Sequence, residues 1–239
     1  MLHGTFIWAD LSTFRRDVTE PFYSAVMGWR FDDGLASTGG LAVAQVYTMP
    51  EKFQKIGMPS FWMSYIAVND ITAAIDTARD LGGKVELGPE PFEGGQIALI
   101  RDPLGAGFTV YEGAPLGEVA RGSGSRLGHA LFVSDASAVR DFYAQLFGWT
   151  FGAGFGGMQS ILAHDQRVAS LHEVPSEEQR GKEQYWAVLF AHDNLAMAQA
   201  RALEHGGQIV SETQLPEGPT TIIADPDGGT FFLVGKVAT

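Results

Sequence analysis

The chain contains no cysteine among its 239 residues. This absence excludes a disulfide framework, a thiolate metal site and a cysteine nucleophile. Basic residues are also scarce, because 16 Lys and Arg face 28 Asp and Glu, for a formal net charge of −12. An acidic surface of this kind repels phosphate backbones and anionic lipids, so neither nucleic acid nor a membrane is expected as a partner.

No apolar run approaches the length that a bilayer-spanning helix needs. The first residues, Met1 to Thr5, also lack a basic stretch followed by an apolar one, so no signal peptide is predicted. A cytoplasmic location is therefore our expectation. What the chain does have is glycine, with 30 residues, which indicates many tight turns in a strand-rich fold.

Several short motifs occur twice, in the same order and at nearly constant spacing. Phe22-Tyr23 and Gly28-Trp29 recur 120 residues later, as Phe142-Tyr143 and Gly148-Trp149. The Gly82-Gly83 pair recurs at Gly206-Gly207, and Asp102-Pro103-Leu104-Gly105 recurs at Asp225-Pro226-Asp227-Gly228. Such ordered recurrence predicts a tandem duplication.

A stretch rich in glycine and serine, residues 113–125, shows no sustained periodicity and is predicted to be a linker. The two modules are therefore predicted to span residues 1–112 and 126–239. Duplication within one chain supplies a pairing of modules, so a monomer is expected, with a homodimer as the alternative.

The sequence pattern of each module predicts helices separated by strands. Val139, Phe142, Tyr143, Leu146 and Phe147 form one apolar helical stripe that ends at Gly148. The first-module counterpart is predicted to begin near residues 17–19, because Pro21 belongs in an opening helical turn. Asp70 is predicted to cap a second helix, and 193–206 repeats that plan. The order strand, helix, three strands, repeated twice in each module, predicts an α+β fold of four βαβββ units.

With these motifs in this order, the chain resembles the vicinal-oxygen-chelate (glyoxalase, bleomycin-resistance and dioxygenase) superfamily. The resemblance covers nearly the whole chain outside the linker. It implies that paired βαβββ units form open, barrel-like cups that bind small molecules. It does not decide function, because the family includes isomerases, dioxygenases, lyases and antibiotic-sequestering proteins.

Metal-dependent members of the family carry His or Glu ligands at set strand positions of each module. Carried over to this chain, the first-strand position falls on Trp8 and Gly128, and the central-strand position on Met63 and Trp186. The position after Asp-Pro-x-Gly falls on Thr109 and Phe232. None is a carboxylate or an imidazole, the groups that such metals need. We therefore predict no metal site and no cofactor. His129, one residue beyond the expected position, is predicted to turn toward the helix as a core histidine.

Strand alternation predicts which side chains line the cups. The predicted set is largely aromatic and uncharged, which suits a flat or apolar ligand. The alternative is that these side chains only fill a closed core. The predicted binding residues are Trp8, Met63, Tyr65, Thr109, Tyr111, Phe132, Trp186 and Phe232.

Asp10 is the carboxylate placed on the same face. Burial among aromatic rings would raise its pKa, and it is the candidate catalytic proton acceptor, with a rim position as the alternative. The sequence thus predicts a metal-independent binder of a small aromatic or apolar molecule. A metal-dependent lyase, isomerase or dioxygenase with atypical ligands (His129 with Asp10 or Glu112) and a scaffold with closed cups are the alternatives.

Overall fold

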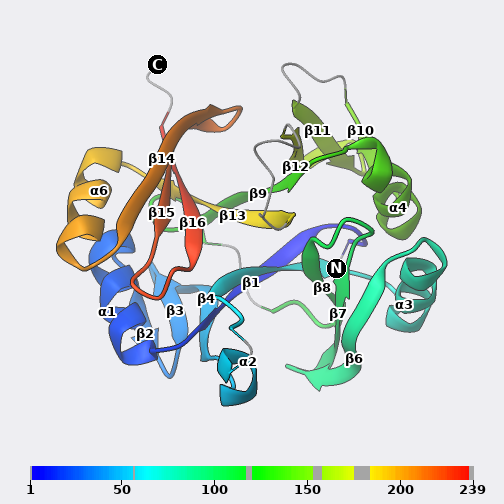
Figure 1. Ribbon diagram of the computed structural model, residues 1–239, viewed down its shortest axis with the longest axis horizontal. Coiled ribbons are helices and arrows are strands. Elements are labelled where there is room, and N and C mark those ends of the chain that lie inside the picture. Colours follow the sequence, from blue (N-terminus) through cyan, green and yellow to red (C-terminus); the bar gives the residue numbers. More distant parts are fainter. Residues whose placement is uncertain (1, 56, 117–119, 153–157, 175–183, 237–239) are drawn as a thin grey trace. The chain divides into compact units, whose positions relative to one another are not determined.

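The computed structural model describes residues 2–55, 57–116, 120–152, 158–174 and 184–236 (Figure 1). The expected α+β fold of tandem βαβββ units is confirmed. The first half of the chain contains the elements β1 (Phe6–Thr13), α1 (Arg16–Met27), β2 (Arg30–Asp32), β3 (Leu35–Thr38), β4 (Leu41–Thr48), α2 (Glu51–Lys55), β5 (Phe61–Ala67), α3 (Ile71–Asp80), β6 (Lys84–Phe92), β7 (Gly95–Arg101) and β8 (Gly107–Gly113).

The second half repeats this order. Its elements are β9 (Arg126–Val133), α4 (Ser137–Phe147), β10 (Thr150–Phe151), β11 (Met158–Ala163), β12 (Gln166–Glu173), β13 (Tyr185–His192), α6 (Leu195–Glu204), β14 (Gln208–Leu215), β15 (Gly218–Ala224) and β16 (Thr230–Gly235). Part of the predicted linker, residues 117–119, lies outside the described residues. The module boundaries that we placed at residues 112 and 126 stay a prediction.

The side chain of a capping residue accepts a backbone N–H at the start of α3 and of α6. Asp70 caps α3 as predicted, because its Oδ1 accepts the Ala73 N–H at 2.9 Å. The equivalent cap of α6 is Asn194, one residue after the position expected from the sequence. Helix α1 begins at Arg16 and not at 17–19, so Pro21 lies in its second turn. The proline is exposed, and solvent can hydrate the carbonyl that loses its helical partner.

Each half of the chain forms one eight-stranded sheet. The first, sheet A, has the order β2-β3-β4-β1-β5-β8-β7-β6, and the second, sheet B, has the order β10-β11-β12-β9-β13-β16-β15-β14. The first strand of each βαβββ unit pairs in parallel with the last, as β1 does with β4 and β9 with β12. Antiparallel hairpins of consecutive strands, such as β7–β8, β11–β12 and β15–β16, extend each sheet outward, and β1 lies beside β5 and β9 beside β13 at its centre.

The chain divides into two compact units that each draw on both sheets. Unit 1 comprises residues 1–8, 64–116 and 128–187, and unit 2 comprises residues 9–63, 117–127 and 188–239. In unit 1, α3 contacts α4, and in unit 2, α1 contacts α6, as Figure 1 shows. One apolar core lies in each unit. Each unit therefore combines the last part of one sequence repeat with the first part of the other.

A buried chain of three polar groups recurs in the two units. In unit 1 the Trp186 indole donates to Tyr143 Oη at 2.9 Å, and Tyr143 donates to Asp102 Oδ2 at 2.9 Å. In unit 2, Trp62 donates to Tyr23 at 3.0 Å, and Tyr23 to Asp225 at 3.2 Å. We call these two groups the Trp-Tyr-Asp chains. The aspartate of each comes from the repeat that does not supply the tyrosine.

The other repeated motifs have structural roles of the same kind. A Cβ atom at Gly83 would approach the Phe142 ring to 2.7 Å, and one at Gly207 would approach Phe22 to 2.6 Å. The indole of Trp149 donates to the Gly4 carbonyl at 2.8 Å, and that of Trp29 to the Gly124 carbonyl at 2.6 Å. The motifs that reveal the duplication are thus the ones that join the repeats inside each unit.

Among the described residues, every helix is too short or too polar to span a bilayer.

We predict that Tyr143→Phe lowers the free energy of unfolding by about 2–4 kcal/mol, because it leaves a buried indole N–H and a buried carboxylate oxygen without their partner. Tyr23→Phe should have a similar cost in unit 2. Urea denaturation measures both. A loss below about 0.5 kcal/mol for both variants would contradict this role of the tyrosines.

The stability of unit 2 is predicted to depend on pH through Asp225. Burial raises the pKa of Asp225 to about 6, since its carboxyl is nearly inaccessible to solvent. The folded state therefore binds more protons than the unfolded state between pH 4 and pH 6, and stability from this group is lost as pH rises through that window. The unfolding free energy of the wild type relative to Asp225→Asn should fall by on the order of 1–3 kcal/mol between pH 4 and pH 7. A difference that is constant with pH would refute the raised pKa.

A cut in the predicted linker tests which parts of the chain make up each unit. We predict that a protease site inserted at residues 117–119 yields two fragments that still elute together near the 25.7 kDa of the intact chain, because each unit contains chain from both sides of the cut. Native size-exclusion chromatography followed by denaturing electrophoresis measures this. Fragments that separate without denaturant would disprove it.

Candidate functional site

Each sheet has one face that packs on helices and one that points away from them, here called the far face. On β1, Ala9 and Leu11 join the apolar cluster of α1, so Trp8 and Asp10 lie on the far face. On β8, Phe108 and Val110 pack with α3, which places Thr109 and Tyr111 on the far face. The same alternation places Met63, Tyr65, Phe132 and Phe232 there.

Two tyrosines on the far face of sheet A are tightly packed. Tyr65 is 4% exposed and Tyr111 is 0% exposed. Phe92 of β6 lies between them, with ring centroids 5.8 Å from Tyr65 and 6.3 Å from Tyr111. Tyr111 donates to the Ala114 carbonyl at 2.9 Å. The rings of this group therefore resemble a packed core more than an accessible wall.

The remaining first-module candidates lie on β1 and β5. Trp8 belongs to unit 1, whereas Asp10 and Met63 belong to unit 2. Asp10 is 6% exposed, and its backbone pairs with Gln45 of β4. The convergence of Asp10 and Met63 with Tyr65 and Tyr111 on one ligand stays a prediction.

Three rings are stacked on the far face of sheet B, within unit 1. Phe132 of β9 lies between Tyr185 of β13 and His172 of β12, at centroid distances of 5.2 and 4.7 Å. Both pairs are inclined by only 18°. Ser170 Oγ and His172 Nε2 share a hydrogen bond of 2.8 Å. Burial, with a smaller contribution from Arg167, lowers the pKa of His172 to about 4, so the imidazole is neutral at physiological pH.

The expectation that Trp186 lies on this face is wrong. Its side chain belongs to the helix-facing cluster and bonds Tyr143. The pairs Tyr65↔Thr109 and Leu189↔Phe232 align Trp186 with Trp62, so Ala187 is the equivalent of Met63. Counting from the sequence was displaced by one residue, and such a displacement reverses the face. Phe232 lies on the far face in unit 2 and is 1% exposed.

The far-face positions do not fit a divalent metal. With the corrected alignment they hold Trp8, Gly128, Met63, Ala187, Thr109 and Phe232, and the one oxygen among these side chains is a neutral hydroxyl. Among the described residues, no three His, Asp or Glu side chains gather closely enough to hold an ion. We derive no chemistry through a metal at these positions.

The atypical ligands considered from the sequence have other partners. His129 is 2% exposed, its Nδ1 bonds Ser64 Oγ at 2.9 Å, and its ring stacks on Phe6 with a centroid distance of 3.9 Å. It alternates with Leu131 and Val133, so it lies on the helix-facing side as predicted. Glu112 accepts the Ile71 N–H at 2.8 Å, at the start of α3.

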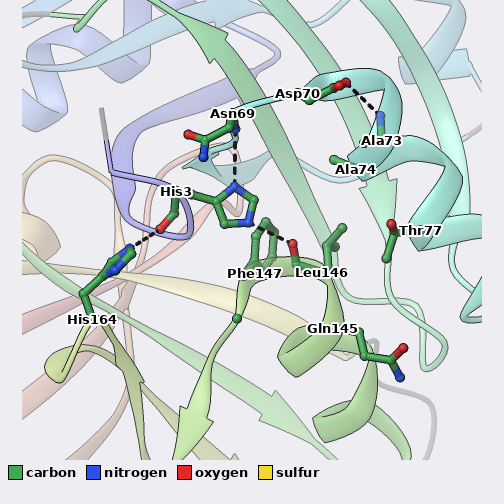
Figure 2. A pocket seen from close by; sticks show the side chains of 11 residues that line it. His3, Asn69, Asp70, Ala73, Ala74, Thr77, Gln145, Leu146, Phe147 and His164 are labelled. Atoms are coloured by element: carbon green, nitrogen blue, oxygen red, sulfur yellow. Dashed lines mark hydrogen bonds between the residues drawn. The ribbon is translucent and has the colours of Figure 1, made fainter.

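Unit 1 also contains a hollow of about 490 Å³ on its helical side (Figure 2). It lies between the start of α3 and the end of α4, and His3 and His164 form part of its wall. His3 accepts the Asn69 N–H at 3.3 Å and donates to the Leu146 carbonyl at 3.1 Å. His192 makes equivalent bonds to Asn194 and Val26 in unit 2. Because the arrangement recurs, we interpret these histidines as bridges between helix ends.

Sequence reasoning missed His172, Tyr185 and Phe92. His172 lies near the end of β12, and its neighbour across the sheet could not be assigned without the parallel pairing of β9 with β12. That pairing follows from the βαβββ plan, and it sets His172 beside Phe132. The proximity of His172 and Phe132 could therefore have been predicted from the sequence once the order of the strands in the sheet was worked out.

Comparison with known proteins agrees with this fold. The family model described as the Glyoxalase/Bleomycin resistance protein/Dioxygenase superfamily matches residues 15–110 and 126–232. The chain is 29% identical to "Putative glyoxylase CFP32" of Mycobacterium tuberculosis, covering 97% of this chain and 94% of that protein. It is 30% identical to "Anthracycline biosynthesis protein DnrV" of Streptomyces peucetius, covering 97% and 93%.

Solved structures share the fold at low sequence identity. The Mn(II)-bound glyoxalase from Novosphingobium aromaticivorans has a TM-score of 0.67 at 13% identity, covering 99% of this chain and 83% of that one. The 2,3-dioxygenase LapB from Pseudomonas sp. KL28 has a TM-score of 0.61 at 11% identity, covering 100% and 94%. The two matched stretches and the full-length relatives show that this chain belongs to the glyoxalase/bleomycin resistance protein/dioxygenase superfamily.

Proposed function

We propose that this protein binds a small aromatic or apolar molecule without a metal ion. The carrying observation is chemical: the six family ligand positions hold apolar side chains, a glycine and one threonine. Hard and borderline divalent metals bind through carboxylate, imidazole or thiolate groups, which these positions do not supply. Aromatic rings on the far faces are instead suited to stacking with a flat ligand.

The names of two relatives support an aromatic ligand. The proteins of Streptomyces peucetius and Streptomyces sp. strain C5 are named for anthracycline biosynthesis and cover the chain almost completely. Anthracyclines are polycyclic aromatic compounds. A ligand of this general type would match the aromatic far faces, and the acidic net charge disfavours a strongly anionic ligand.

A metal-dependent lyase, isomerase or dioxygenase with atypical ligands is the second candidate. The buried carboxyl of Asp10 favours it, because a buried acid that faces a ligand can accept a proton. We therefore propose Asp10 as the proton acceptor of any such reaction. His129 and Glu112 are poor candidates for metal ligands, because their side chains already form hydrogen bonds with Ser64 and with the Ile71 N–H.

We predict that untagged protein, loaded with Mn²⁺, Fe²⁺, Ni²⁺ or Zn²⁺ and then dialysed, retains less than roughly a tenth of an equivalent of metal, because the liganding groups are lacking. Elemental analysis measures the content. Aromatic compounds should raise the melting temperature equally with and without EDTA. Asp10→Asn should leave both results unchanged. Near-stoichiometric metal in the wild type that Asp10→Asn abolishes would refute the proposal and favour the enzyme.

A further inference from the structure

The hollow on the helical side of unit 1 lies at a position where unit 2 has a charged side chain. Helices α3 and α6 align through their N-caps, and helices α4 and α1 align through their left-handed terminal glycines. With this alignment Thr77 corresponds to Arg201, and Gln145 corresponds to Ala25. The two units can therefore be compared residue by residue at this junction of two helices.

In unit 2 a guanidinium group lies at the end of the neighbouring helix. Arg201 of α6 donates from Nη1 to the carbonyl oxygen of Ala25, in the last turn of α1, at 3.0 Å. The last carbonyl groups of a helix lack helical partners and carry partial negative charge, so a cation beside them is favourable. Neither α1 nor α4 has a basic residue in its own last turn. Unit 2 thus supplies the cation from α6.

In unit 1 the chain has an uncharged residue, Thr77, at this position, and the hollow of about 490 Å³ lies beside it (Figure 2). Of the described residues that line the hollow, none is Lys or Arg, and Asp70 is the one carboxylate. Asp70 caps α3 at 2.9 Å, but the neutral amide of Asn194 caps α6 at the same distance, so capping does not require the charge. Unit 1 therefore has the carboxylate, whereas unit 2 has the cation and a neutral cap.

The other groups around the hollow also suit a cation with an apolar tail. Figure 2 shows Asp70 and Thr77 of α3 on one side of it and Leu146 of α4 on the other. His3 accepts the Asn69 N–H and donates to the Leu146 carbonyl, which is the pattern of a neutral imidazole. A planar guanidinium has several N–H donors, so it can bond a carbonyl oxygen and a carboxylate together. A hollow that contains only water is the competing explanation.

We propose that this hollow is a binding site for a small alkylguanidinium compound, whose guanidinium group takes the position that Arg201 has in unit 2. The ligand donates to the Gln145 carbonyl and pairs with Asp70. Its volume lies within the range of about 300–1,000 Å³ that is typical of ligand pockets. The net charge of −12 favours the approach of a cation. The site is additional to the far faces, so its failure would leave the proposed function untouched.

The test uses the full chain with N-ethylguanidinium and its neutral isostere N-ethylurea. Heteronuclear NMR titration, followed on the backbone amides of residues 69–77 and 145–148, gives both the place of binding and the dissociation constant. N-ethylguanidinium should bind at a single site with a dissociation constant of about 1 mM or lower. N-ethylurea should bind at least about tenfold more weakly, because it has no charge to pair with the carboxylate and the helix end.

Variants of α3 assign the binding to the hollow. Thr77→Arg copies unit 2 and should weaken N-ethylguanidinium at least about tenfold, because its own guanidinium takes the position of the ligand. Thr72→Arg is the matched control, since it adds the same charge at an exposed position outside the hollow, and should change affinity less than about twofold. Asp70→Asn keeps a capping group of the kind found at Asn194 and should weaken binding about threefold.

A second blocking variant guards against misfolding of the first. Ala73→Met introduces the residue that unit 2 has at Met197, and it should weaken binding without adding a charge. Urea denaturation checks that each variant is folded. Affinity that neither Thr77→Arg nor Ala73→Met lowers would overturn the site, and so would equal affinity for N-ethylurea. Absence of saturable shifts at about ten times the expected dissociation constant would also overturn it, in favour of a hollow that contains only water.

Discussion

The two Trp-Tyr-Asp chains are the interaction on which the rest of the structure depends. Each takes a buried aspartate from a strand turn of one repeat and a tyrosine and tryptophan from the other. A buried carboxylate oxygen without a donor is costly, and the tyrosine of the other repeat donates to Oδ2 of each aspartate. Backbone N–H groups of the turn complete its coordination, as at Ala106 and Gly229. Packing of the Phe142 and Phe22 rings on glycines follows from the same junction.

Much of this could be predicted from the sequence, for a physical reason. Apolar stripes, helix caps and terminal glycines depend on residues close in sequence, so the βαβββ plan could be predicted. The core position of His129 followed from the alternation of side chains along a strand. The start of α1 was not, because an exposed Pro21 can lie in a second turn. The face of Trp186 depended on a register that no nearby residue fixes, and one displaced residue moved it from the helix-facing core to the predicted site.

Candidate functional residues are harder to predict from the sequence than the fold. Repeated motifs attract attention, yet here their observed contacts join the two repeats. The two repeats differ at some far-face positions, for example at Phe132, where the first repeat has Ser12. The first-repeat face that looked most functional, with Tyr65 and Tyr111, is packed by Phe92.

The composition of the compact units has a consequence for how the protein can evolve. Because each unit contains chain from both repeats, neither repeat can lose its core residues while the other preserves a folded half. Core residues of both repeats are therefore constrained together, although duplication usually allows one copy to change. On the far faces, one copy can keep the ancestral side chains while the other acquires a new specificity.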